Sequence, residues 1–143
     1  MLKKYLVNLI ENSYHQNGQN ILSLLETNKK AVLIDLGCDD GGWTSELAKR
    51  VNTKDIHGVE VVKERRNSAT KKGIKAIDAD LNKKLPFKDN SYDIVHANQV
   101  IEHLYDTDTF VEEIHRILKL GGYAVISTEN LSSWHNIFAL TLG

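Results

Sequence analysis

The residues best suited to ligand chemistry form a short turn in which one acid and two glycines stand at fixed spacing. Asp35 lies near the end of the mostly apolar run Val32–Leu36, and Gly37 and Gly41 follow it and lead into a helix-like segment. Glycine lets a backbone turn sharply and approach a ligand closely, where any Cβ would intrude. The free amides at the start of the next helix would then face that ligand. Ordinary strand–turn–helix corners also use glycines, so the turn alone does not distinguish a ligand-binding turn from a purely structural corner.

The elements that must position this turn alternate regularly along the chain. Strands are expected at residues 32–36, 55–60, 74–78, 92–97 and 123–127, with helices at 44–51, 63–72 and 107–118. Two helical pieces separated by a break at Asn17–Gly18 are expected before them, and Gly121–Gly122 is expected to end the last helix. Strands that alternate with helices imply right-handed crossovers and a parallel sheet covered on both faces. The prediction is a Rossmann-like three-layer α/β sandwich.

The spacing Asp-x-Gly-x-x-x-Gly resembles motif I of the class I S-adenosylmethionine-dependent methyltransferases, and it differs from the G-x-G-x-x-G dinucleotide fingerprint. An acid at the end of the first strand, which those enzymes carry, suits a cationic ligand with a free amino group. Many relatives have a further glycine where this chain has Asp39, which tolerates unusual backbone angles. The chain is most similar to the small-molecule branch known as methyltransferase type 11 or methionine-biosynthesis-W-like. The resemblance covers roughly residues 30–140 and is carried by Asp80-Leu81, Leu85-Pro86-Phe87 and residues 89–95, 101–103, 117–123 and 126–130.

This resemblance implies a cofactor site at the ends of successive strands. Glu60 would accept hydrogen bonds from two ribose hydroxyls, and Val61 would border the adenine ring. Asp80 would bond the adenine amino group, and the backbone beside Leu81 would form a hydrogen bond with a ring nitrogen of the adenine. Asn98 would lie near the methionyl end of the cofactor. The acids and glycines of the set are expected to converge on one pocket. The complete cofactor-binding set is Asp35, Gly37, Cys38, Gly41, Glu60, Val61, Asp80, Leu81 and Asn98.

Two other chemistries would use some of the same residue types. An NAD-dependent oxidoreductase would also use Glu60, but its glycine spacing is different. His103 is the best candidate general base because it lies just past the fourth strand. It directly follows Glu102, however, and adjacent residues do not share a helix face, so no ready-made dyad is expected and no catalytic residue is assigned. The histidines lack the spacing of a zinc motif, and no metal is expected.

Composition narrows the classes of partner. The chain has 18 basic and 19 acidic side chains, a formal charge of −1, so nucleic acid is not expected as a partner. Cys38 is the only cysteine, which excludes an intrachain disulfide and a cysteine-rich metal site. Residues 1–7 do not resemble a signal peptide, and no run approaches the roughly 18 apolar residues of a membrane span. We expect a cytoplasmic protein without a membrane span.

The organisation expected is one domain over residues 1–143, with an N-terminal helical segment at 1–28 and a Rossmann-like core at 29–143. The family sheet order would be 3-2-1-4-5, lacking the usual last two strands. The chain would then be either C-terminally truncated or a minimal domain completed by association. The apolar stretch 134–142 and an uncovered fifth strand favour a homodimer.

The function expected from the resemblance is S-adenosylmethionine-dependent methyl transfer to an unidentified small-molecule acceptor, with S-adenosylhomocysteine as the product. The alternative is a catalytically inert module that binds S-adenosylmethionine or a partner. Binding without turnover would favour the inert module.

Overall fold

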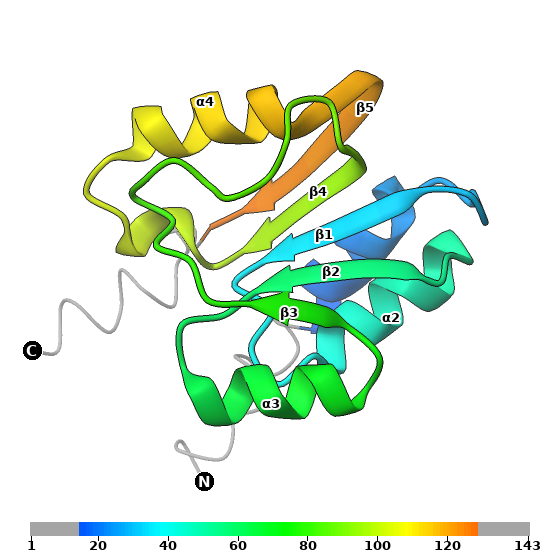
Figure 1. Ribbon diagram of the computed structural model, residues 1–143. Coiled ribbons are helices and arrows are strands. Elements are labelled where there is room, and N and C mark those ends of the chain that lie inside the picture. The colour runs from blue at the N-terminus through cyan, green and yellow to red at the C-terminus, as the bar shows by residue number, and fades with distance from the viewer. Residues whose placement is uncertain (1–14, 129–143) are drawn as a thin grey trace, which may run out of the picture.

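The computed structural model of the protein describes residues 15–128. Its strands form one sheet in the order β3-β2-β1-β4-β5, and every neighbouring pair is parallel, as Figure 1 shows. The strands are β1 (Val32–Leu36), β2 (Asp55–Val59), β3 (Lys75–Ile77), β4 (Tyr92–Asn98) and β5 (Leu118–Ser127). The helices are α2 (Gly42–Val51), α3 (Lys63–Lys71), the 3-10 turn η1 (Ile101–His103) and α4 (Thr107–Ile117). The predicted α/β class and strand order are confirmed, and all carboxyl ends lie at one edge of the sheet.

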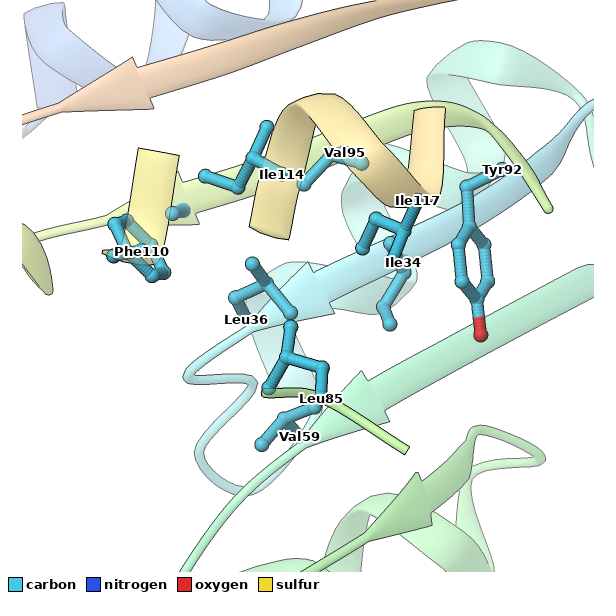
Figure 2. Packing of buried hydrophobic residues seen from close by; sticks show 10 residues of the cluster. Ile34, Leu36, Val59, Leu85, Tyr92, Val95, Phe110, Ile114 and Ile117 are labelled. Atoms are coloured by element: carbon cyan, nitrogen blue, oxygen red, sulfur yellow. The ribbon is translucent and has the colours of Figure 1, made fainter. Parts of the chain in front are cut away.

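Two apolar cores cover the two faces of the sheet because successive strand side chains point to opposite sides. On one face, Ile34 and Leu36 of β1 pack with Phe110, Ile114 and Ile117 of α4, as Figure 2 shows. The opposite face carries a second cluster, which joins α2 and the N-terminal helix (residues 15–24 of the described chain) to the sheet. That cluster contains Ile21, Leu25, Ala31, Leu33, Leu47, Val51, Ile94 and Val125. Helices therefore cover both faces, as the three-layer prediction requires.

Two predicted helix boundaries are wrong. Residues 15–24 are helical without interruption, so the expected break at Asn17–Gly18 is absent from this segment. Helix α4 ends before Gly121–Gly122, which lie inside β5 instead. There Tyr92 pairs with Leu118 while Ile94 pairs with Tyr123, so the strand bulges. A Cβ on Gly122 would lie 2.9 Å from the carbonyl oxygen of Asp93, so this glycine permits a close strand approach.

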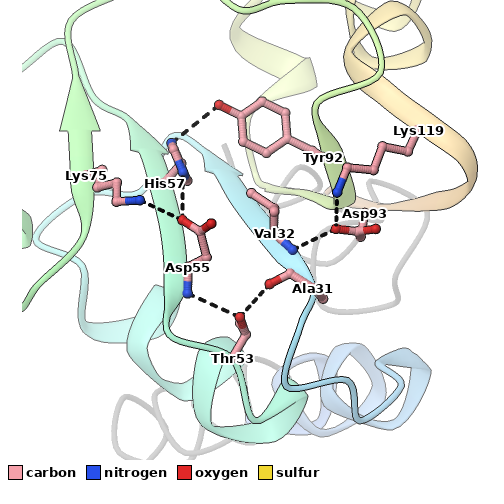
Figure 3. A network of polar contacts seen from close by, with 9 residues as sticks. All are labelled: Ala31, Val32, Thr53, Asp55, His57, Lys75, Tyr92, Asp93 and Lys119. Carbon is pink, nitrogen blue, oxygen red and sulfur yellow. Dashed lines mark hydrogen bonds and ion pairs between the residues drawn. The ribbon is translucent and has the colours of Figure 1, made fainter.

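Polar contacts tie together the amino-terminal ends of the strands, at the edge opposite the glycine turn (Figure 3). The Asp93 carboxylate accepts from the Val32 amide and pairs with Lys119, each at 2.7 Å. His57 lies between Asp55, at 3.1 Å, and the Tyr92 hydroxyl, at 3.4 Å. These contacts join residues of β1, β2, β4 and β5, so they hold the sheet together away from the site.

Strand β5 is, with β3, one of the two edge strands of the sheet within residues 15–128, and its Leu120 side chain is exposed. The segment 134–142, on which the predicted homodimer and the missing strands depend, lies outside the described residues. The homodimer stays a prediction. Of the helices within residues 15–128, none combines the length and apolar character that crossing a membrane requires.

Candidate functional site

The glycine turn between β1 and α2 follows an unusual backbone path. Gly37, Asp39 and Gly41 have φ values of +88°, +48° and +78°. Asp39 therefore has the kind of unusual backbone angle that it was predicted to tolerate. The amides of Gly37 and Cys38 both donate to the Val59 carbonyl oxygen at 2.9 Å, which fastens the turn to the end of β2. These two amides are satisfied within the fold.

The amide of Gly42, the first residue of α2, is also used internally. It donates to the Asp40 carboxylate at 2.8 Å. The expectation that free amides at this helix start would face a ligand is thus wrong for Gly42. The reason is the neighbouring Asp40, whose short side chain folds back onto the backbone, as aspartates in turns commonly do.

Helix α3 and the residues just after it pack against the turn and supply cations to it. A Cβ on Gly41 would lie 2.5 Å from Ile74 Cδ1 and 2.9 Å from Ala69 Cα. Arg65 of α3 pairs with Asp39 at 3.0 Å, and Lys72 pairs with Asp40 at 2.8 Å. Both pairs are exposed, and such pairs contribute about 0–1 kcal/mol. The hydrogen bond from Lys72 lowers the pKa of Asp40.

Glu60 follows β2 directly and reaches back to the turn. Its side chain is buried, with Oε2 accepting from the Asp39 amide at 3.1 Å and Oε1 accepting from the Val62 amide at 2.7 Å. A carboxylate offers about four acceptor positions, so two remain after these bonds. The carboxylate is thereby held in one orientation with acceptor capacity left for a ligand. Val61 beside it is 61% exposed.

Asp35 lies in a buried polar chain on the α2 side of the sheet. Its Oδ2 accepts from the Thr44 hydroxyl at 2.5 Å, and its Oδ1 lies 2.7 Å from His96 Nδ1. His96 Nε2 lies 3.4 Å from the Trp43 indole nitrogen. Asp35 and His96 are only 2% and 1% exposed, so both side chains are held inside the protein.

No role is predicted for His96 from the sequence. The signal that would have found it is the pairing of β1 with β4, which places Asp35 directly opposite His96. Side chains at paired positions of adjacent strands lie on the same face. A buried acid paired in register with a histidine therefore predicts a hydrogen bond between them.

A pocket of about 300 Å³ opens at the carboxyl edge of the sheet, beside the turn. Carboxylates are prominent in its lining, and Trp43 is its one large aromatic residue. The lining residues are Asp35, Gly37, Cys38, Asp39, Asp40, Trp43, His96 and Asn98. Asn98 accepts from Asn17 of the N-terminal helix at 3.3 Å and from the Ser127 hydroxyl. Burial, reinforced by nearby Asp35 and Glu60, raises the pKa of Cys38 to about 12. The thiol is therefore neutral at physiological pH.

The structure brings some of the predicted site residues into this lining and leaves others around it. Asp35, Gly37, Cys38 and Asn98 line the pocket, and Gly41 and Glu60 shape the turn beside it. The remaining predicted residues, which are not part of the lining, lie at the ends of other strands.

Those remaining residues have surroundings of their own. Asp80 follows β3 and accepts from the Asn82 amide at 3.0 Å, which is the leading cause that lowers its pKa. Leu81 packs against the α4 core. His103 ends η1 and is exposed. Within residues 15–128, no group of three acidic, histidine or cysteine side chains is arranged to hold a metal ion.

Comparison with known proteins identifies the family to which the chain is similar. Residues 34–126 match the methyltransferase domain family. An uncharacterized protein of Methanocaldococcus jannaschii is 36% identical over 104 residues, which are 73% of this chain and 49% of that protein. A demethylmenaquinone methyltransferase of Staphylococcus aureus is 31% identical over 134 residues, covering 86% of this chain and 54% of that enzyme.

A solved structure shows the same fold. A S-adenosylmethionine-dependent methyltransferase of Thermotoga maritima has the same fold, with a TM-score of 0.74 at 24% identity over 94% of this chain and 64% of that one. The chain spans about half the length of the curated relatives it matches. From its matched domain and its sheet order, the chain belongs to the methyltransferase domain family, within the class I S-adenosylmethionine-dependent methyltransferases.

Proposed function

We propose that the pocket binds S-adenosylmethionine and that the protein transfers its methyl group to a small-molecule acceptor. The observation that carries the proposal is an acid-lined pocket beside a glycine turn, at the carboxyl edge of a parallel sheet. Ligands of doubly wound folds bind at this edge. Membership of the methyltransferase family supports the same cofactor.

The residues present fit this cofactor chemically. S-adenosylmethionine carries a cationic sulfonium and a cationic ammonium group, and the lining offers the carboxylates of Asp35, Asp39 and Asp40. Glu60 retains acceptor positions for the two ribose hydroxyls. A Cβ at Gly37 would lie 2.7 Å from Val100 Cγ2, so this exposed turn position is closed to larger residues. Asp80 and Leu81, one strand further along the sheet edge, are proposed to hold the adenine, with Val61 against its ring.

The bound cofactor would supply an electrophilic methyl group through its sulfonium. The protein's own residues bind and orient, and orientation can supply much of the rate. The turn and Glu60 are held by hydrogen bonds to β2 and to the chain just after it, so they change little on binding. A nucleophilic acceptor needs no dedicated base. For an acceptor that must lose a proton, exposed His103 on η1 is the candidate group to receive it.

Calorimetry on the full chain tests cofactor binding, with S-adenosylhomocysteine as the ligand and NAD as the control. We expect saturable binding of the first and none of the second. Tritium transfer from labelled S-adenosylmethionine to a panel of small molecules then tests turnover. Failure to bind S-adenosylhomocysteine would refute the proposal. Binding without transfer to any acceptor would favour the inert module instead.

We further propose that the protein forms a homodimer through β5 and the segment after it. The exposed Leu120 and Ile126 on the edge strand support this, because uncovered edges and apolar side chains tend to find partners. Light scattering at micromolar concentration is the measurement. A mass of 16.1 kDa, that of a single chain, would contradict it.

A further inference from the structure

The hydrogen bonds around His96 define which of its nitrogens carries the proton. An indole N–H can only donate, so Trp43 Nε1 donates to His96 Nε2, which must be unprotonated. The proton of a neutral imidazole is then on Nδ1, which donates to Asp35 Oδ1 at 2.7 Å. The second carboxylate oxygen of Asp35 is engaged by Thr44, so the acid cannot turn away. His96 is thus held as one tautomer in one orientation.

Trp43 is the residue that this arrangement positions. It is the second residue of α2, and its indole lines the pocket. The far side of the ring faces the N-terminal helix, where a Cβ on Gly18 would lie 3.2 Å from Trp43 Cη2. The Trp43 and His96 rings are tilted by 53°, with their centres 6.4 Å apart. The indole is therefore held between a close helix backbone and one nitrogen acceptor.

We propose that the Asp35–His96 pair is a positioning device for the pocket, fixing the Trp43 indole as the wall that receives the cationic end of the cofactor. His96 acts through Trp43 and has no direct part in methyl transfer. Asp39 and Asp40 border this pocket but pair with Arg65 and Lys72, so the buried carboxylate of Asp35 is the negative charge that favours the cationic end here. The inference rests on the proposed function and names residues that determine its cofactor affinity.

The competing explanation is that His96 merely satisfies the buried Asp35 carboxylate. A buried charge without a partner is strongly destabilising, so such a role would be sufficient reason for a histidine here. Two substitutions separate these explanations. The side-chain amide of His96→Asn takes the place of Nδ1, so it keeps a donor for Asp35 and loses the acceptor for Trp43. The longer His96→Gln places its carbonyl oxygen near Nε2, so it keeps the acceptor for Trp43 and loses the donor for Asp35.

Calorimetry with S-adenosylhomocysteine measures the affinity of both variants, and urea unfolding measures their stability. The positioning role predicts that His96→Asn binds roughly two- to ten-fold more weakly, as expected from one lost hydrogen bond. His96→Gln, which keeps the acceptor, should bind more tightly than His96→Asn while unfolding at a lower urea concentration than the unmodified chain. Weaker binding by His96→Gln alone, or equal binding by both variants, would overturn the positioning role.

Nitrogen NMR of the histidine-labelled, unmodified chain provides a readout independent of any variant. The expected spectrum shows a neutral His96 with the proton on Nδ1, and an indole N–H signal of Trp43 that shifts when S-adenosylhomocysteine binds. A proton on Nε2, or on both nitrogens, would overturn the inference even where a variant fails to fold. Normal S-adenosylhomocysteine binding with such a spectrum refutes only the His96 role. No binding at all refutes the proposed function as well.

Discussion

The contact between the glycine turn and α3 can be tested by adding one methyl group. In Gly41→Ala the new Cβ would meet Ile74 Cδ1 at 2.5 Å and the Ala69 backbone at 2.9 Å, at a φ of +78°. A non-glycine residue in this left-handed region costs about 1–2 kcal/mol. Forcing extra atoms into a packed site costs about 1–3 kcal/mol more. We expect a total loss of roughly 2–5 kcal/mol in the free energy of unfolding.

Gly73→Ala is the matched control. Gly73 has a φ of +87°, close to that of Gly41, but a Cβ there meets nothing within 4 Å. It should therefore cost only the backbone term of about 1–2 kcal/mol. The entropy that an alanine removes from the unfolded chain is the same at both positions and cancels in the comparison. The difference between the two variants, about 1–3 kcal/mol, isolates the packing of the turn against α3.

Urea unfolding followed by circular dichroism measures both losses, and calorimetry with S-adenosylhomocysteine measures binding at low urea. We expect Gly41→Ala to bind more weakly because the displaced turn carries the pocket lining, and Gly73→Ala to bind as the unmodified chain does. Equal losses of stability in the two variants would refute the argument from close packing. Unchanged binding by Gly41→Ala would show that the turn does not shape the pocket.

Three further predictions concern ionisable side chains. Glu60→Gln should weaken S-adenosylhomocysteine binding about ten-fold or more, since bonds to a charged group contribute roughly 1.5–3 kcal/mol. Calorimetry should find no change in the exposed control Glu112→Gln, and unchanged binding by Glu60→Gln would limit Glu60 to its structural bonds with the Asp39 and Val62 amides. Because burial raises the pKa of Cys38 to about 12, iodoacetamide at pH 8 should label it only after unfolding; rapid labelling of the folded chain would contradict this. Burial also raises the pKa of Tyr92 to about 12, so the unfolded chain loses this proton from about pH 10 while the folded chain keeps it. The free energy of unfolding should therefore fall from pH 10 to 12 more steeply than in Tyr92→Phe, and urea titrations giving equal slopes would refute that cause.

The sequence by itself determined the fold class and the type of nearly every element. Most predicted bounds differ from the observed ones by one or two residues, with the start of β5 as the main exception. These features are local, because apolar runs, helical spacing and the glycines that form turns act within a few residues of the chain. The strand order also followed, because a family resemblance supplied the topology that local patterns leave open. Asp35 and Glu60 were placed at the strand ends for the same reasons.

Tertiary structure alone decided how the site residues are used. The Asp35–His96–Trp43 chain joins residues of β1, β4 and α2, and only the strand register brings them together. The amides of Gly37 and Cys38 in the glycine turn both donate to the Val59 carbonyl oxygen of the neighbouring strand, a partner that no local pattern indicates. In each case the partner is distant in sequence. Local patterns record which groups a residue carries, but hydrogen-bond partners depend on the packing of strands and helices that the whole chain must form first.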